Sequence, residues 1–433
     1  MFTIACLALF CLVQGQGSTQ RFINSDIDRF WTAYDKVVAT TDTAEQRALL
    51  NTHFLDHATP GLTAFMGVRN YGADEYLVAI HSYPLFWKSV RQNTQHVSDV
   101  FPAVEAELVN LRKYYPALRP ADLCFTIGAL RSGGTVGNGM VLIGSELAFA
   151  DHNTVSSEFP DRMATNRREY FDSDPIEDVV LLAIHEYVHT QQKPLVHNLL
   201  SQCVYEGVGE YVSTLVTGRP STLPAIPFGK ANTERVREAF EKDLFNFLVP
   251  GKWMWSDDPN AFNVRDMGYY VGYTMCEMYF NKANDKQKAI TELIELDYTD
   301  EAAFGSFVEA TGYLSQPLDT LFARFERTRP TVVTVEPFVN GDTSVKPGLT
   351  RITVRFSEPM DVNFRNFDYG PVGEEFSLRI KEVIGFSEDH RSITFDVDLA
   401  PGRRHQMTVA NRFRNEQGIP LRPYVIDIST TSE

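Results

Sequence analysis

The stretch "SDPIEDVVLLAIHEYVHTQQKP", residues 173–194, predicts one helix that carries two histidines near its end. Asp174 fits the N-cap position, Pro175 the first helical position and Glu177 the capping-box position. The helix must end at or before Pro194, because the residue preceding a proline disfavours helical backbone. The histidines therefore lie in the last turns of the helix.

His185 and His189 lie one turn apart on the same face of this helix, so both imidazoles can reach one metal ion. The adjacent Glu186 can act as a general base on a water molecule at that ion. Zinc is the expected ion, because neutral imidazoles suit a borderline-soft cation. The alternative for two histidines at this spacing is a solvated or core-satisfied helix face.

A second pair, His53 and His57, has the same spacing. It has no glutamate beside the first histidine, and no ligand-like residue follows at a suitable distance. We expect this pair to bind no metal.

The stretch "CVYEGVGEYVSTLVTGRP", residues 203–220, predicts a second helix that ends near Gly218, with Pro220 beyond it. Glu206 and Glu210 lie one turn apart on this helix, among mostly apolar residues. Carboxylates in apolar surroundings need a partner, which disfavours the alternative of an exposed acidic face. A divalent cation is a natural partner.

Glu206 within "EGVGEY" resembles the helix that supplies the third zinc ligand in gluzincin metallopeptidases. The aminopeptidase branch has the form "EGxAxY/F" there, and Gly209 stands in place of its alanine. The resemblance implies that Glu206 is the third ligand and that Glu210 accepts a hydrogen bond from a ligand histidine. The reverse assignment of the two glutamates stays open.

The wider pattern "SGGT…IGSE…HEYVHTQQ…YEGVGEY…RDMGYYVGY" is similar to predicted secreted bacterial zinc proteases, including relatives of a gliding-motility lipoprotein. Gluzincins commonly stabilise the oxyanion of amide hydrolysis with a Tyr or His donor from a later helix. Tyr269 and Tyr270 are the candidates for that catalytic role, the alternative being an aromatic core stripe.

A small β portion precedes the histidine helix. Two β-prone runs, 123–130 and 140–149, flank the glycine loop 131–139 and predict a short antiparallel pair. Zincin clefts usually align substrate along an edge strand, and residues 140–146 are the expected one. The chain lacks the "GxMEN" stretch with which aminopeptidase relatives hold a substrate amino terminus, which favours an endopeptidase.

The region after Pro330 consists of short alternating runs separated by turn residues, which is typical of a β-sandwich. "FSEPMD", residues 356–361, resembles a strand end of bacterial immunoglobulin-like domains, which implies an accessory role. The expected fold class is α+β: a mainly helical zincin-like peptidase domain with a small β portion, followed by an all-β immunoglobulin-like sandwich. The expected domains are a signal peptide at 1–17, the peptidase domain at 18–329 and the sandwich at 330–433.

The apolar start "MFTIACLALFCLV", residues 1–13, is too short to span a bilayer and predicts a secretory signal. No basic residue precedes it, which departs from the usual signal pattern, and lipidation at Cys6 is an alternative. The expected location is secreted, periplasmic or at the cell surface. The three cysteines outside this segment predict buried small hydrophobes rather than disulfides: Cys124, Cys203 and Cys276.

A formal net charge of −16 argues against a nucleic-acid or anionic-membrane partner. The expected function is a secreted zinc metallopeptidase that acts on peptide or protein substrates, without a transmembrane span. The alternative is a cell-envelope assembly or adhesion protein with a structural or vestigial zinc site. Structural zinc normally has four protein ligands, which disfavours a purely structural site here.

Overall fold

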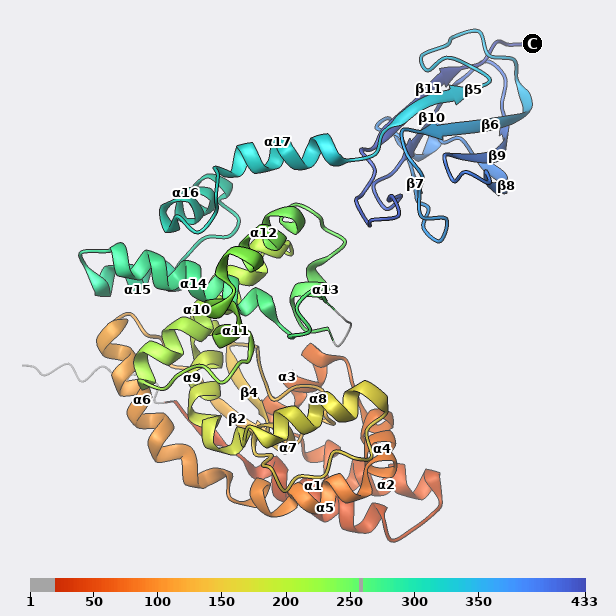
Figure 1. The fold of residues 1–433 in the computed structure, drawn as a ribbon. Coiled ribbons are helices and arrows are strands. Elements are labelled where there is room, and N and C mark those ends of the chain that lie inside the picture. Colours follow the sequence, from red (N-terminus) through yellow and green to blue (C-terminus); the bar gives the residue numbers. More distant parts are fainter. Residues whose placement is uncertain (1–19, 257–259) are drawn as a thin grey trace, which may run out of the picture. The chain divides into compact units, whose positions relative to one another are not determined.

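The computed structural model describes residues 20–256 and 260–433, and their helices and strands form an α+β fold (Figure 1). The signal peptide expected at 1–17 lies outside the described residues. The chain divides into two compact units. The first comprises the chain up to Pro194 with Val208–Thr222 and Phe280–Leu296, and the second comprises Leu195–Gly207, Leu223–Tyr279 and Asp297–Glu433.

The first unit contains a four-stranded sheet with the strand order β1-β2-β4-β3. Its strands are β1 (Phe22–Ile23), β2 (Leu123–Thr126), β3 (Gly134–Gly137) and β4 (Met140–Gly144). β1, β2 and β4 run parallel, and β3 runs antiparallel to β4.

The antiparallel pair expected from 123–130 and 140–149 is therefore wrong, because β2 and β4 run in the same direction. The glycine loop between them forms β3, which reverses the chain and leaves β4 inside the sheet. Glycine weakens a strand in isolation, but here it allows close packing. A Cβ atom on Gly137 would lie 2.7 Å from Val68 Cγ2. The edge strand is β3 rather than residues 140–146.

Helices surround this sheet, and α9 contacts β3, β4 and α6. Several begin at side-chain caps: Asp42 accepts from Glu45 N, and Thr59, followed by Pro60, accepts from Leu62 N. The helices of the first unit are α1 (Ser25–Val37), α2 (Thr43–His53), α3 (Pro60–Arg69), α4 (Ala73–Ser82), α5 (Pro84–Gln95), α6 (Phe101–Tyr114), α7 (Ser145–Ala148), α8 (Asp161–Asp172), α9 (Val179–His189) and α15 (Lys286–Ile294).

The histidine helix α9 starts later than the sequence indicates. Pro175–Asp178 form a 3₁₀ turn, and regular helix begins at Val179. Asp174 does not cap it: this residue has a φ of 52°, and its carboxylate accepts a hydrogen bond from His152 N at 2.8 Å. The helix ends at His189, before Pro194 as expected, and its last turns hold the histidines.

The second unit is helical before residue 330. Helix α10 (Leu199–Thr217) starts in this unit, ends in the first, and is followed by Gly218 with a φ of 66°, as expected for a C-terminal glycine. The other helices are α11 (Ala225–Ala231), α12 (Thr233–Asp243), α13 (Pro250–Trp253), α14 (Met267–Lys282), α16 (Glu301–Thr311) and α17 (Leu318–Thr328).

Helices α10 and α14 touch backbone to backbone in the second unit. A Cβ atom on Gly207 would lie 2.1 Å from the carbonyl carbon of Gly272, and one on Gly272 would lie 1.7 Å from the Cys203 carbonyl oxygen. No side chain fits at either position, so the two glycines fix how closely the helices approach.

The C-terminal segment forms two antiparallel sheets with the orders β5-β6-β9-β8 and β11-β10-β7. Buried side chains of both sheets, including Ile352, Phe395 and Ile426, form one hydrophobic cluster. The strands are β5 (Val332–Glu336), β6 (Gly348–Phe356), β7 (Phe367–Asp368), β8 (Ile380–Phe386), β9 (Ser392–Leu399), β10 (Arg404–Val409) and β11 (Tyr424–Ser429).

The cysteines at 124, 203 and 276 are buried and free, as expected. Within 20–256 and 260–433, no helix combines the length and apolarity needed to cross a membrane.

The hydrophobic cluster of the two sheets contains only residues from Val335 to Ile428. We therefore expect the fragment 331–433 to fold alone and to unfold cooperatively in urea. Circular dichroism of the isolated fragment checks this. A fragment without a cooperative transition would show that contacts with the preceding chain, such as those of Arg329 with the carbonyl groups of Pro420 and Leu421, are required for the fold.

Candidate metal centre

His185, His189 and Glu206 each place a ligand atom within 4.8 Å of the other two. Among the described residues, these three form the one group of at least three potential metal ligands. The group could hold a metal ion. Both histidines are buried, and Glu206 is partly buried. His53 and His57 belong to no such group in the described part of the chain.

The two imidazoles are oriented so that their Nε2 atoms face each other at 3.0 Å. His185 Nδ1 lies 3.0 Å from Glu210 Oε2, and His189 Nδ1 lies 2.5 Å from Gln192 Oε1. Both partners are acceptors, so each Nδ1 carries the ring proton and each Nε2 exposes a lone pair. Two Nε2 atoms that face each other in this way are suited to share one metal ion.

The separation of the two Nε2 atoms is slightly shorter than that between two ligands of a tetrahedral zinc ion. Nitrogen ligands at about 2.0–2.1 Å from zinc are separated by about 3.3 Å in that geometry, and the Nε2 atoms are 3.0 Å apart. Glu206 supplies an oxygen as the third donor. Glu210 does not belong to the ligand group, but its carboxylate contacts His185 Nδ1. This arrangement corresponds to the assignment in which Glu206 is the ligand and Glu210 orients a ligand histidine.

The end of α9 is held in place by the loop before β2. The Tyr187 hydroxyl accepts from Ala121 N at 2.9 Å and donates to the Arg119 carbonyl at 3.1 Å. The Arg119 guanidinium donates to the Gln191 carbonyl at 2.9 Å. These bonds anchor the turn that carries His189.

Gly209 allows α10 to lie directly against the imidazoles. A Cβ atom at this position would be 3.0 Å from His189 Cε1 and 3.1 Å from His185 Nε2. A larger residue would displace the rings, so glycine is the residue that this close approach favours.

The edge strand β3 lies against Glu186. A Cβ atom on Gly134 would be 2.6 Å from Glu186 Oε1, so the carboxylate occupies the space that a side chain would fill. Glu186 is 7% exposed, as are His185 and His189. The proposed base and the edge strand are therefore direct neighbours.

The two candidate tyrosines have different surroundings. The Tyr269 hydroxyl accepts from Trp255 Nε1 at 3.2 Å and hydrogen-bonds the Glu206 carboxylate. The Tyr270 hydroxyl instead lies 3.0 Å from Thr233 Oγ1. Of the two, Tyr269 is the one beside the ligand group.

Burial, and after it the charge of Glu206, raise the pKa of Tyr269 well above its ordinary value. The phenol therefore keeps its proton at neutral pH and can donate a hydrogen bond.

Three residues at the centre were not identified from the sequence. Gln192 lies three residues after His189, in the turn that follows α9, so its contact with that histidine is local in sequence. Gly134 and Trp255 give no local signal, because their contacts with Glu186 and Tyr269 join distant parts of the chain.

A buried carboxyl group holds the loop that leads into β3. Glu146 is fully buried, and Gly128 N and Leu130 N donate to its Oε1 at 2.9 and 2.7 Å. Ala129 and Leu130 have positive φ angles of 50° and 64°, which cost energy in residues with side chains. Burial raises the pKa of Glu146 to about 7.

Comparisons with known proteins give little further information. No protein-family model matches the chain, and no curated protein matches it. A structure that matches is the crystal structure of the S-layer protein rSbsC(31-844), at 12% sequence identity and a TM-score of 0.18. The match covers 65% of this chain and 39% of that chain, so this chain spans well under two thirds of the S-layer structure. A TM-score this low supports no conclusion about fold or function.

The purified protein should hold about one metal ion per chain, because three convergent ligands usually bind tightly. The double variant His185→Ala, His189→Ala should lose it. The matched control is His53→Ala, His57→Ala, which removes a pair with the same spacing and should keep the metal. Elemental analysis measures all three proteins, and equal metal content in both double variants would show that the centre is elsewhere.

Glu146 should make stability depend on pH. Its folded-state pKa of about 7 lies above the ordinary value of 4.5, so its stabilising contribution is present below that value and is lost as pH rises through about 7. Glu146→Gln keeps an acceptor for the two backbone N–H groups without titrating. Urea unfolding at about pH 5 and about pH 8 should show the wild type losing stability relative to the variant. If the stability difference between the wild type and the variant is the same at both pH values, the raised pKa of Glu146 is contradicted.

Proposed function

We propose that the protein is a zinc-dependent peptidase whose metal ligands are His185, His189 and Glu206. The observation that carries the proposal is the pair of Nε2 atoms facing each other at 3.0 Å. Glu206 completes the donor set, and Glu186 is buried beside the same helix turn. This combination has one ligand fewer than a structural zinc site requires, which leaves a position for a reactant.

Zinc is the proposed ion because two imidazole nitrogens and one carboxylate oxygen form a common catalytic zinc donor set. When bound, zinc supplies Lewis acidity that polarises a carbonyl group and makes a water molecule more acidic. The hydrogen bond from His185 Nδ1 to Glu210 fixes the ring so that Nε2 is available as a donor atom.

Glu186 is the proposed general base. Its carboxylate takes a proton from the attacking water, and the hydroxide oxygen forms a bond to the peptide carbonyl carbon. The protonated Glu186 then gives this proton to the leaving nitrogen as the C–N bond breaks. One residue therefore transfers a single proton from water to the amine product.

Tyr269 and β3 are the proposed substrate contacts. The Tyr269 phenol keeps its proton, as its raised pKa indicates, and donates a hydrogen bond to the developing oxyanion. The outer edge of β3 offers backbone donors and acceptors to an extended peptide, directly beside Glu186. An extended peptide on a strand edge favours an endopeptidase.

The finer assignments of fold and location belong to the same proposal. They comprise a zincin-like fold for 18–329, an immunoglobulin-like fold for 330–433, and a location outside the cytoplasm. The sheet with edge strand β3, α9 and the two sheets after residue 330 support the first two. The third rests on the apolar sequence at 1–13.

The base and the third ligand should respond differently to the same chemical change. Glu186→Gln cannot take a proton, so peptide hydrolysis should fall by on the order of 10² or more while zinc remains bound. Glu206→Gln replaces a charged ligand by a neutral one, so zinc affinity itself should fall. Glu177→Gln, an exposed position just before α9, is the control and should change neither.

The test measures hydrolysis of a broad peptide library together with zinc content. Equal activity of the wild type and Glu186→Gln on a peptide that the wild type cleaves would exclude the proposed mechanism. Zinc in both proteins without hydrolysis by either would favour an envelope assembly or adhesion protein that retains a vestigial site.

A further inference from the structure

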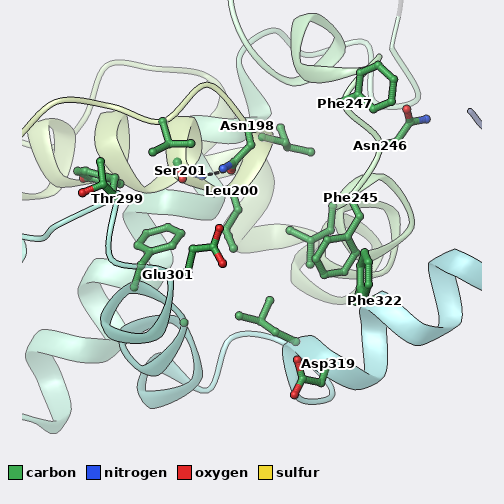
Figure 2. Close-up of a pocket in the computed structure, with 17 residues that line it drawn as sticks. Asn198, Leu200, Ser201, Phe245, Asn246, Phe247, Thr299, Glu301, Asp319 and Phe322 are labelled. Atoms are coloured by element: carbon green, nitrogen blue, oxygen red, sulfur yellow. Dashed lines mark hydrogen bonds between the residues drawn. The ribbon is translucent and has the colours of Figure 1, made fainter. Parts of the chain in front are cut away.

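The second unit contains a cavity of about 520 Å³ at the start of α10 (Figure 2). Leu199, Tyr298 and Phe304 line it and are buried, while the lining residues Phe247 and Phe322 are exposed. A half-buried, largely apolar cavity of this size is suited to a small molecule.

The charges of the cavity have one sign. Glu301 and Asp319 line it, and no Lys, Arg or His does. Neither carboxylate forms an ion pair within the described part of the chain, and both are exposed. Each lies in the first turn of a helix. The cavity therefore offers two negative charges without a balancing cation.

Aromatic rings form a large part of the apolar lining. Phe245 and Phe322 pack edge to face, with ring centroids 5.2 Å apart. Phe247, Tyr298 and Phe304 complete the set of five rings. Aromatic faces attract cations, and they do so more strongly where water is excluded.

The wall of the cavity also contains an unpaired polar atom. Ser201 is 1% exposed, and its Oγ has no hydrogen-bond partner among the described residues. Its backbone N–H is satisfied by Asn198 Oδ1 at 2.9 Å, the bond drawn in Figure 2. A buried hydroxyl without a partner is unfavourable.

We propose that this cavity binds a small organic ammonium ion that carries an apolar group. The rings and aliphatic side chains hold the apolar group, and Glu301 and Asp319 neutralise the charge. The proposal goes beyond the peptidase function and does not depend on it.

Calorimetric titration of the full-length protein with phenethylamine, a cation at neutral pH, tests the proposal. The neutral isostere phenethyl alcohol is titrated in parallel. The ammonium compound should bind about tenfold or more tightly than the alcohol, because only the cation gains from the carboxylates and ring faces. Equal affinities, or no binding of the cation at millimolar concentration, would overturn the proposal.

Two variants locate the binding site. Glu301→Gln with Asp319→Asn should remove the preference for the cation and retain weak binding of both compounds. Gly305→Leu should block both compounds, since its side chain enters the cavity from helix α16, where an added Cβ atom would meet its nearest neighbour at 3.8 Å.

Matched controls separate local from general effects. Gly67→Leu changes an exposed helical glycine whose added Cβ atom would meet nothing within 4 Å, and Glu309→Gln changes another exposed carboxylate of α16. Both controls should bind like the wild type. Preference for the cation that survives the loss of both cavity carboxylates would place binding elsewhere and overturn the proposal, whatever the stability of the Gly305→Leu protein.

Discussion

The close backbone approach of helix α10 to its neighbours is the constraint on which the candidate centre depends. Gly207 lies against Gly272 of α14, and Gly209 lies against the rings of His185 and His189. Side chains at Gly207 and Gly209 would push the helix away from Gly272 and from the two imidazole rings. Glu206 and Glu210 lie one turn apart on this helix, so their side chains leave it on the same face.

Two buried carboxyl groups have different electrostatic roles in this protein. Glu210 accepts from an imidazole ring and so fixes a tautomer. Glu146 accepts from the backbone N–H groups of Gly128 and Leu130, and burial raises its pKa to about 7. Glu210 therefore orients an imidazole ring, whereas Glu146 holds an irregular loop. Both satisfy the rule that buried polar groups need partners.

Two places in the protein suit a bound cation. The Nε2 atoms of two histidines face each other at 3.0 Å, and the cavity at the start of α10 combines aromatic rings with two exposed carboxylates. In both places the groups present attract positive charge. Such arrangements indicate binding more directly than the presence of a cavity does.

The sequence by itself determined the features that depend on local spacing. The four-residue interval between His185 and His189 puts both rings on one face, and the end of α10 at Gly218 follows from local backbone preference. The change to alternating strands after residue 330 is also local, because a strand has a period of two residues.

Tertiary contacts decided the remainder. The parallel direction of β2 and β4 depends on β3 forming from a glycine loop, and Tyr269 rather than Tyr270 reaches Glu206 because α14 packs against α10 through glycines. The Asp174 carboxylate accepts a hydrogen bond from His152 N instead of capping α9. Each outcome depends on contacts with residues distant in sequence. A local sequence pattern does not encode the energy of such contacts.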